Sequence, residues 1–369
     1  MKKFFVAIIF CFMIMLSSCS KKEEYQEYKF ELNEDGMSYT FSGFDSNVTN
    51  DVVIPNIHNN MPVTKIGEYA FYYNSVESVF ISENIKTFFS NIFAGCDDLK
   101  KIEVDKDNKK FDSRNDCNAI ILSDTNTLIA GCNTTKIPND IEKIGLGAFQ
   151  FINITEIDIP DSVHTIEDYA FYHSNLDYLV IPDNVLTIGN NAFAECRNLA
   201  MVRFTNNLQS IGEKCFYDTA ISEIYIPKTV NKIGGGAFGF CSKLNKIEVD
   251  EENEVYDSRD NCNAIIETKA NKIIAGCRNS SIFDFIDTIG TYAFSIAQIT
   301  ETFIIPSNIK IIEPHGFICG GSANPVVKFE NNIGWYYFNS NNEKVEFNVS
   351  EEELYKNLWY QDFTLYCEN

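Results

Sequence analysis

The segment Ile166-Glu167-Asp168-Tyr169-Ala170-Phe171 is one copy of a six-residue phrase that recurs along the chain and ends in Phe. Further copies end at Phe71, Phe149, Phe193, Phe216, Phe238, Phe294 and Phe317, and a degenerate copy ends at Phe93. Successive Phe residues are 22 or 23 positions apart, except for two steps of 56, from 93 to 149 and from 238 to 294. A fixed period in this range predicts a solenoid, in which each coil buries its apolar face only against its neighbours. Because such a repeat serves packing at every copy, the pattern disfavours an enzyme.

The coil that follows residue 166 shows how one repeat is built. After the phrase and a short turn, Leu176, Leu179 and Ile181 form an L-x-x-L-x-L pattern whose last part alternates as a half-buried strand does. Pro182 cannot donate a hydrogen bond to a neighbouring strand, so it ends the strand. Stacking of such strands predicts a parallel sheet along one wall. We expect the Ala-Phe segments to form tight helical turns on another wall.

The full repeat, Ile-Pro-x-x-Val-x-x-Ile-Gly-x-x-Ala-Phe-x-x-Cys-x-x-Leu, resembles the BspA-type leucine-rich repeat of bacterial surface proteins. The resemblance extends over about residues 63 to 319, and the segment from Asn60 to Gly67 looks like the usual start of such an array. It implies a curved right-handed leucine-rich-repeat solenoid, with parallel β strands on one wall and short strands and helical turns opposite. The better-known members are surface adhesins that bind host matrix proteins or other bacteria.

The two long steps contain inserts, near residues 105–136 and 250–281, that match each other at an offset of 145, as Cys117 and Cys262 do. We infer that a block of this length was duplicated. Each insert has two apolar runs around a polar turn, at 124–126 and 269–271, which predicts a projecting hairpin. Disulfides Cys117–Cys132 and Cys262–Cys277 are possible if the runs pair in the right register; burial of free thiols is the alternative.

Other cysteines follow the repeat. Cys96, Cys196 and Cys241 each lie three residues after the Phe of a phrase, and Cys215 replaces the Ala before Phe216. Since free Cys behaves as a small buried hydrophobe, these positions predict rungs of a core ladder and not disulfides.

The N-terminus predicts a lipoprotein signal peptide over residues 1–18. Lys2 and Lys3 precede an apolar run from Phe4 to Leu16 that is too short to cross a bilayer as a helix. The motif Leu16-Ser17-Ser18-Cys19 resembles a lipobox, which implies cleavage before Cys19 and lipidation of that residue. A polar tether is expected over 19–35, and Ser20 resembles the signal for sorting to the bacterial outer membrane. We expect the protein to face the cell surface; attachment facing the periplasm is left open.

The repeat fades after Phe317, so we place the solenoid over 36–325 and a C-terminal α+β cap over 326–369. Strands are predicted at 334–338, 344–347 and 363–367. Ser350 and Glu353 have the spacing of a capping box, which predicts a short helix.

No residue pattern indicates chemistry. The four histidines lack metal-ligand spacing, and the acidic segments near 105–112 and 250–257 lack the calcium-loop pattern. We therefore predict no catalytic residue, no metal and no cofactor. The net charge of −22 disfavours nucleic acid as a partner, and the lipid anchor is the expected contact with a membrane.

Binding is instead predicted on the strand wall, where residues on either side of a buried position point outward. The middle coils carry residue types that are enriched at interfaces, namely Tyr178, Val180, Met201, Arg203 and Tyr225. Exposed tyrosines are also ordinary on β surfaces. The predicted function is a non-catalytic, adhesin-like surface protein that binds a host or bacterial protein. The alternative is a glycan-binding or structural envelope lipoprotein, with the aromatic C-terminal end or the hairpins as the sugar site.

Overall fold

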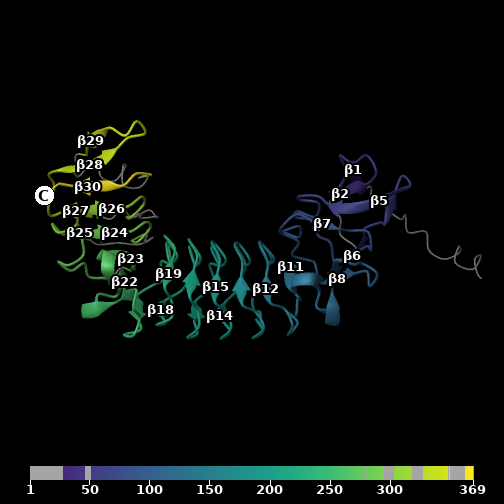
Figure 1. Ribbon diagram of the computed structural model, residues 1–369, viewed down its shortest axis with the longest axis horizontal. Coiled ribbons are helices and arrows are strands. Elements are labelled where there is room, and N and C mark those ends of the chain that lie inside the picture. Colours follow the sequence, from purple (N-terminus) through teal and green to yellow (C-terminus); the bar gives the residue numbers. More distant parts are fainter. Residues whose placement is uncertain are drawn as a thin grey trace, which may run out of the picture.

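The computed structural model describes residues 28–45, 51–277, 279–294, 303–317, 327–347, 349 and 362–368. These residues form a stack of β coils that runs straight in its middle and turns to the same side at both ends, giving the molecule the outline of a U (Figure 1). The stack changes direction near β8 (Lys101–Val104) and β11 (Thr127–Gly131), and again near β19 (Lys232–Ile233) and β22 (Ala264–Glu267). Both bends therefore coincide with the two inserts.

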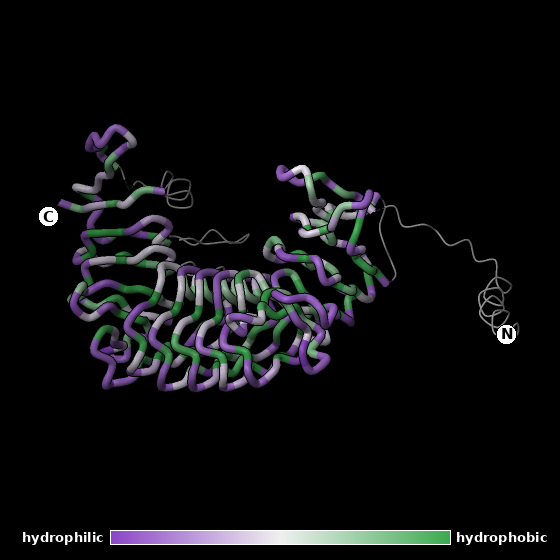
Figure 2. The backbone as a smooth tube through the Cα atoms, turned by 45° about the vertical axis from the view of Figure 1, so that its right-hand side comes forward, coloured by the Kyte–Doolittle hydropathy of each residue, from purple (hydrophilic) through white to green (hydrophobic). Residues whose placement is uncertain are grey.

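The strand wall is built from parallel strands in register. Its pairs are β3 (Asp51–Val53) with β6 (Ser78–Ile81) and β6 with β8, β14 (Tyr178–Val180) with β16 (Met201–Arg203), β18 (Glu223–Ile226) with β20 (Lys246–Val249), and β25 (Phe303–Ile305) with β27 (Val327–Phe329). Along β18, exposed and buried residues alternate, as the period of a half-buried strand requires. Hydrophobic and hydrophilic stretches accordingly form bands across the stacked coils (Figure 2).

A second wall holds two-residue strands that contain the Ile of each phrase, and we call it the Ile ladder. Its central strands are β12 (Lys143–Ile144), β13 (Thr165–Ile166), β15 (Thr187–Ile188), β17 (Ser210–Ile211) and β19, which pair in parallel with each Ile opposite the next. Toward the N-terminus, β2 (Tyr39–Phe44), β5 (Met61–Ile66) and β7 (Thr87–Phe88) pair in the same way. Beyond the second insert, β24 (Thr288–Ile289) and β26 (Ile311–Ile312) continue the pattern.

The Phe side chains fill the interior as a pile of rings. From Phe149 through Phe171, Phe193 and Phe216 to Phe238, neighbouring centroids are 4.9 to 5.7 Å apart and the planes differ by at most 5°. Each ring buries a large apolar area, and the near-parallel contacts add to that burial. The phrase therefore specifies the core.

The Ala-Phe segments form hydrogen-bonded turns, and the expectation of helical turns is wrong. The residue two positions before the Phe has a positive φ in each complete phrase, for example 60° at Tyr69, 57° at Tyr169 and 51° at Lys214. A right-handed helix needs negative φ at every residue, so it cannot pass through these positions. The N–H groups bond to the next coil instead, as Phe149 N does to Ala170 O at 2.7 Å and Phe171 N does to Ala192 O at 2.7 Å.

Each insert contains an antiparallel hairpin at the position where the sequence predicts one. In the first, β9 (Phe111–Asp112), β10 (Ala119–Leu122) and β11 pair in turn; in the second, β21 (Tyr256–Asp257), β22 and β23 (Lys272–Gly276) do so. The backbone of Gly131, at the end of β11, packs directly against the ring of Phe149 in the next coil, because a Cβ there would be 2.2 Å from Cε1 of that ring. The hairpins thus join the Ile ladder and cover the core at the bends. Four short 3-10 helices lie within the inserts.

The possible insert disulfides are not formed: Cys117, Cys132, Cys262 and Cys277 are all buried free thiols. Ala119 pairs with Gly131, and extending this register places residue 118, not Cys117, opposite Cys132. Neighbouring positions on a strand point to opposite faces, so the two thiols diverge. Burial is the main cause that raises the pKa of Cys117, to about 11.

The repeat cysteines are buried, as predicted. Cys96 Sγ donates to Phe71 O at 2.9 Å, and Cys196 and Cys241 donate to Phe171 O and Phe216 O at 3.1 Å each. Each thiol therefore hydrogen-bonds the carbonyl of the Phe in the preceding coil.

Both ends of the array are closed by antiparallel strands. β1 (Tyr28–Leu32) pairs with β2, so the predicted tether is too long at its C-terminal side. At the other end β30 (Leu365–Cys367) pairs with β26 and with β28 (Trp335–Phe338), which pairs with β29 (Lys344–Glu346). Residues 1–18, Cys19 and the helix expected from Ser350 lie outside the described residues. Within those that are described, no helix has the length and apolarity needed to cross a membrane.

Candidate binding surfaces

The five wall residues that the sequence singles out all face solvent. The exposed fraction is 49% for Tyr178, 53% for Val180, 62% for Met201 and 48% for Tyr225, and Arg203 is also exposed. Between them Leu179 and Val202 are buried and hold the strands onto the core. The outward positions thus follow from the alternation of the strands.

The structure brings four of these residues together. Tyr178 lies opposite Met201, and Val180 lies opposite Arg203, in the pair β14–β16. We call Tyr178, Val180, Met201 and Arg203 the strand patch. It is a flat, contiguous surface on rigid backbone, with an apolar area beside one guanidinium group.

Tyr225 lies on the next coil of the same wall, where it also borders a groove. Its hydroxyl donates to Asp250 Oδ2 at 2.7 Å, and it lies opposite Glu248 in the pair β18–β20. Tyr225, Glu248 and Asp250 border an acidic groove of about 950 Å³ beside the second insert. The hydrogen bond to Asp250 is the largest of the causes that raise the pKa of Tyr225, to about 12. The tyrosine is therefore held against the groove.

The acidic side chains in the turns that border the inserts accept hydrogen bonds from neighbouring residues of the chain. Asp250 Oδ1 accepts from Glu252 N at 2.9 Å, and Asp257 accepts from Arg259 and Thr268. Asn108 is buried, and its amide donates to Ser82 O at 3.1 Å and Ile85 O at 3.0 Å. In the described part of the chain, no group of His, Cys, Asp and Glu side chains is arranged to hold a metal ion.

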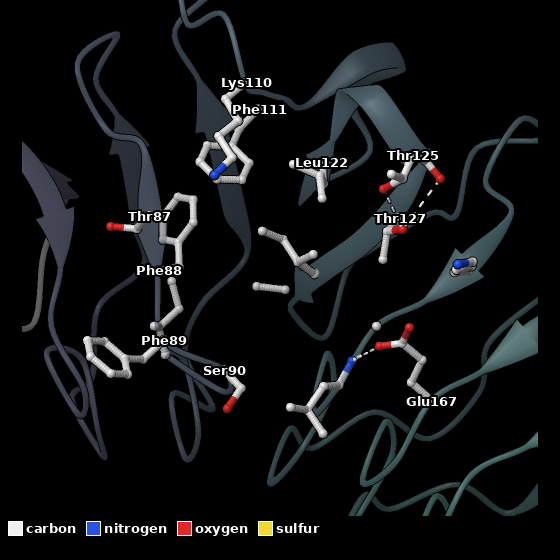
Figure 3. Close-up of a pocket in the computed structure, with 16 residues that line it drawn as sticks. Thr87, Phe88, Phe89, Ser90, Lys110, Phe111, Leu122, Thr125, Thr127 and Glu167 are labelled. Atoms are coloured by element: carbon white, nitrogen blue, oxygen red, sulfur yellow. Dashed lines mark hydrogen bonds between the residues drawn. The ribbon is translucent and has the colours of Figure 1, made fainter.

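A pocket at the first bend was not predicted from the sequence. It has a volume of about 470 Å³ and lies between β7 and the hairpin β10–β11 (Figure 3). We call it the corner pocket. Phe88 and Phe111 line it on one side, and Leu122 and Ile129 line it from the hairpin. Phe89 is at its border, and its ring extends away from the hairpin (Figure 3). Phe88 and Phe111 are in contact, with ring centroids 4.6 Å apart.

Polar groups surround this apolar space. Lys110 and Lys143 are exposed at its border, and Lys110 Nζ donates to Lys86 O at 2.8 Å. The hydroxyls of Thr125 and Thr127 lie 2.8 Å apart. Across the pocket, Glu167 Oε2 accepts from the backbone N–H of Leu146 at 2.9 Å (Figure 3).

One signal in the sequence marks this pocket. The degenerate phrase that ends at Phe93 has Phe88-Phe89 where the other copies have Ile followed by Gly or Glu. Read along the sequence, this substitution looks like loss of the repeat. In the structure Phe88 supplies a ring of the pocket, and Phe89 lies exposed at its border.

A third hollow, of about 330 Å³, lies on the wall formed by the turns of the Ala-Phe segments, which we call the turn wall. Tyr73, Phe151 and His173 border it, and the rings of Phe151 and His173 are 5.0 Å apart. Beside them, Asn175 Nδ2 donates to Asn153 Oδ1 at 3.0 Å. Aromatic faces thus lie next to amide groups on an open surface.

Comparison with known proteins places this fold among leucine-rich repeat proteins. The BspA type leucine rich repeat region matches residues 30–124, 125–258 and 261–365, in six copies. A leucine rich cell surface protein from Faecalibacterium prausnitzii is 27% identical, over 82% of this chain and 74% of that one, with a TM-score of 0.49. A leucine-rich repeat protein from Eubacterium ventriosum is 22% identical, over 73% of this chain and 64% of that one, with a TM-score of 0.50.

None of the curated proteins compared matches this chain. The family model matches nearly all of residues 30 to 365, which is well over half of the sequence, and the repeat that it describes is the coil seen in the structure. The chain therefore belongs to the BspA-type leucine-rich repeat family.

Proposed function

We propose that this protein is a non-catalytic, adhesin-like protein of the cell surface that binds a host or bacterial protein through the strand patch. The observation that carries the proposal is the contiguous exposure of Tyr178, Val180, Met201 and Arg203 on one strand pair. Aromatic, Met and Arg side chains are the types enriched at the centres of protein interfaces.

The family supports this proposal at a coarser level. Proteins with the BspA-type repeat are typically bacterial surface proteins, and leucine-rich repeats are typically non-catalytic and generally bind proteins. A solenoid wall changes its specificity by surface substitution while the fold is kept, so the partner must be sought in the exposed residues.

The backbone beneath the patch favours binding as well. Leu179 and Val202 are buried, and the strands above them are held in register by the parallel ladder. A partner therefore meets a preorganised surface, and less conformational entropy is lost on association than with a flexible loop. Arg203 adds a charge-assisted hydrogen-bond donor to an otherwise apolar area.

The strand patch is tested by substitution and measured affinity. Host matrix proteins and the surface proteins of neighbouring bacteria are screened with the purified chain, and each confirmed partner is titrated against Tyr178→Ala, Arg203→Ala and the double variant. We expect each single change to weaken binding by about tenfold, as truncation of a central interface residue does. Glu103→Ala, at an exposed position of β8 on a distant coil of the same wall, is the matched control. Unchanged affinity in the double variant would remove the strand patch as the site.

The proposal includes attachment to the outer membrane through a lipid on Cys19, facing outward. The lipobox Leu16-Ser17-Ser18-Cys19 and the polar segment after it support this placement. Growth with a radiolabelled fatty acid should label the protein, and Cys19→Ala should abolish the label. Protease added to intact cells should digest the protein. Protection from protease in intact cells would contradict a surface location.

Glycan binding is the second candidate, and the hollow on the turn wall favours it. Flat aromatic faces beside amide groups suit the apolar faces and hydroxyls of a sugar ring. A glycan array probed with the purified chain tests this function, with Tyr73→Ala as the variant, because its ring is 57% exposed and its loss should spare the core. Sugar binding that survives this change would place any glycan site elsewhere.

A further inference from the structure

The duplication within the chain gives the corner pocket an internal comparison. Residues of the first block and their counterparts in the second are 145 positions apart, as Phe93 and Phe238 show. Both blocks have the same hairpin and lie at the two bends of the stack. A feature that packing at a bend requires should therefore occur in both blocks, whereas a feature of one block alone has another origin.

At the second bend, a lysine side chain lies over the surface that corresponds to the corner pocket. Lys272, the counterpart of Thr127, forms an ion pair with Glu313 at 2.5 Å, and its side chain passes over Gly290. Tyr256, the counterpart of Phe111, accepts a hydrogen bond from Ile233 N at 2.8 Å. Glu313 accepts from Thr291 N at 2.9 Å, as Glu167 accepts from Leu146 N at 2.9 Å. Both blocks therefore have a glutamate that accepts from this backbone N–H, whereas only the second block has the covering lysine, Lys272.

The apolar lining is also particular to the first block. Phe89, Leu122 and Leu146 have the counterparts Gly234, Glu267 and Thr291, which are smaller or polar. Phe89 is 53% exposed and Leu146 is 48% exposed. Large apolar side chains that line a pocket and remain exposed at its border indicate an occupant that covers the border too.

The charge of the pocket differs from that of the molecule. Lys110 and Lys143 stand at its border with one acid, Glu167, which is already engaged by Leu146 N. The chain as a whole has a net charge of −22. At the second bend both lysine positions are uncharged, as Val255 and Thr288. The first corner is therefore a local basic site with an aromatic floor, and complementarity favours an anionic occupant.

We infer that the corner pocket is an anchor site for a partner polypeptide, which inserts a bulky apolar side chain flanked by carboxylates. The phenyl rings of Phe88 and Phe111 receive the inserted side chain, and Lys110 and Lys143 bind the flanking acids. A volume of about 470 Å³ accommodates one large side chain with its neighbouring backbone. The inference rests on the proposed function only in that the partner is a protein; it places a second contact away from the strand patch.

The test uses a peptide probe and the full chain. Saturation-transfer NMR is recorded with acetyl-Gly-Asp-Phe-Asp-Gly-amide and, for comparison, with the same peptide carrying Lys in place of both Asp residues or Ala in place of Phe. We expect transfer to the Phe ring protons of the acidic peptide, and about tenfold weaker binding of each of the other two. Absence of transfer to the acidic peptide, or equal binding of the lysine peptide, would overturn the inference.

The variants come from the second block, so the chain itself indicates that they can fold. Thr127→Lys introduces the lysine that covers the second bend, within reach of Glu167, and should abolish transfer. Leu146→Thr and Lys143→Thr introduce the counterpart residues at exposed positions and should each weaken binding. Lys272→Thr is the matched control at the second bend and should bind as the wild type does. Circular dichroism and thermal melts establish that each variant is folded.

Two outcomes separate this inference from the proposed function. If Thr127→Lys and Leu146→Thr bind the acidic peptide as the wild type does, the corner pocket is not the site, whatever the strand patch does. If these variants lose the peptide while Tyr178→Ala and Arg203→Ala retain it, the anchor site stands, even if the strand patch proves to have no role.

Discussion

Single residues show how the solenoid satisfies polar groups in its core. Cys196 Sγ lies 3.1 Å from Phe171 O and 3.2 Å from Ser174 Oγ, so a side chain of one coil pairs with a buried carbonyl of the previous one. Cys241 repeats this arrangement with Phe216 O and Thr219. A thiol is a weak donor, but it fills the space of a small apolar residue at the same time.

Cys196→Ala should lower the free energy of unfolding by about 1 to 3 kcal/mol, because it leaves a cavity and an unpaired carbonyl. Cys215→Ala should cost less, since Ala occupies the same place in the phrases that end at Phe171 and Phe193. Urea denaturation of the two variants measures the difference. Equal losses would show that the hydrogen bond to Phe171 O contributes nothing beyond packing.

The raised pKa values of the same thiols lead us to predict that the folded protein loses stability at alkaline pH. Burial raises the pKa of Cys196 and of Cys241 to about 11, from an ordinary value of 9.0. The folded state therefore keeps these protons to higher pH than the unfolded state does. Their contribution to stability is complete below about pH 9 and is lost as the pH rises toward about 11.

Urea midpoints measured at rising pH test this sign. The wild type should lose stability across that window, and a double variant with Ala at 196 and 241 should lose less, although tyrosines whose pKa is also raised contribute in both proteins. A double variant with the same decline as the wild type would contradict the assignment to these thiols.

At the scale of elements, the central coils of the Ile ladder stack so closely that a glycine is required after the Ile of β15, β17 and β19. A Cβ on Gly212 would lie 2.4 Å from the carbonyl carbon of Gly189 in the preceding coil. Gly212→Ala should therefore lower the free energy of unfolding by about 2 kcal/mol or more, because the backbones must separate.

Gly235→Ala is the matched control for that change. Its Cβ would meet Thr291 Cβ at 3.4 Å, which side-chain adjustment can relieve. Thermal melts of the two variants should differ clearly. If both variants melt together, close stacking of the ladder is not what demands the glycine.

The ladder also shows what sequence reasoning can and cannot reach. The repeat predicts the coil, the strand wall and the buried Phe and Cys positions, because each depends on period and polarity alone. The short strands of the Ile ladder are implied only by the resemblance to the family. The conformation of the turn wall could not be predicted. Tyr69 and Tyr169 adopt a positive φ there, which is expected of glycine and not of tyrosine. The insert disulfides do not form, because the strand register places residue 118, and not Cys117, opposite Cys132.

The candidate surfaces divide in the same way. The exposure of Tyr178 and Met201 follows from strand alternation and is predictable, whereas the hydrogen bond between Tyr225 and Asp250 of the following coil is not. The corner pocket could not be derived from the sequence, because it lies between β7 and a hairpin more than 30 residues further along the chain, where the stack bends.

At the scale of the whole molecule, the core is divided. One cluster of buried apolar residues extends from Phe41 to Cys277, and a second extends from Cys262 to Leu365, so the two meet at the second insert. In a solenoid each coil is stabilised by its nearest neighbours, and regions on either side of a weak junction can open separately. The C-terminal arm should therefore behave as a unit of its own.

Truncation of one stacked Phe in each core cluster tests whether the two clusters unfold separately. Phe294 stacks on Phe317 at 5.2 Å in the second cluster, and its counterpart Phe149 stacks on Phe171 at 4.9 Å in the first. Each Phe→Ala change should remove about 3 to 5 kcal/mol of local stability. Hydrogen exchange followed by mass spectrometry should show Phe294→Ala accelerating exchange in β23, β24, β26 and β30 while β13, β15 and β17 stay protected. Phe149→Ala should do the reverse. Uniform acceleration along the whole chain in either variant would mean that the coils unfold as one cooperative unit across the second bend.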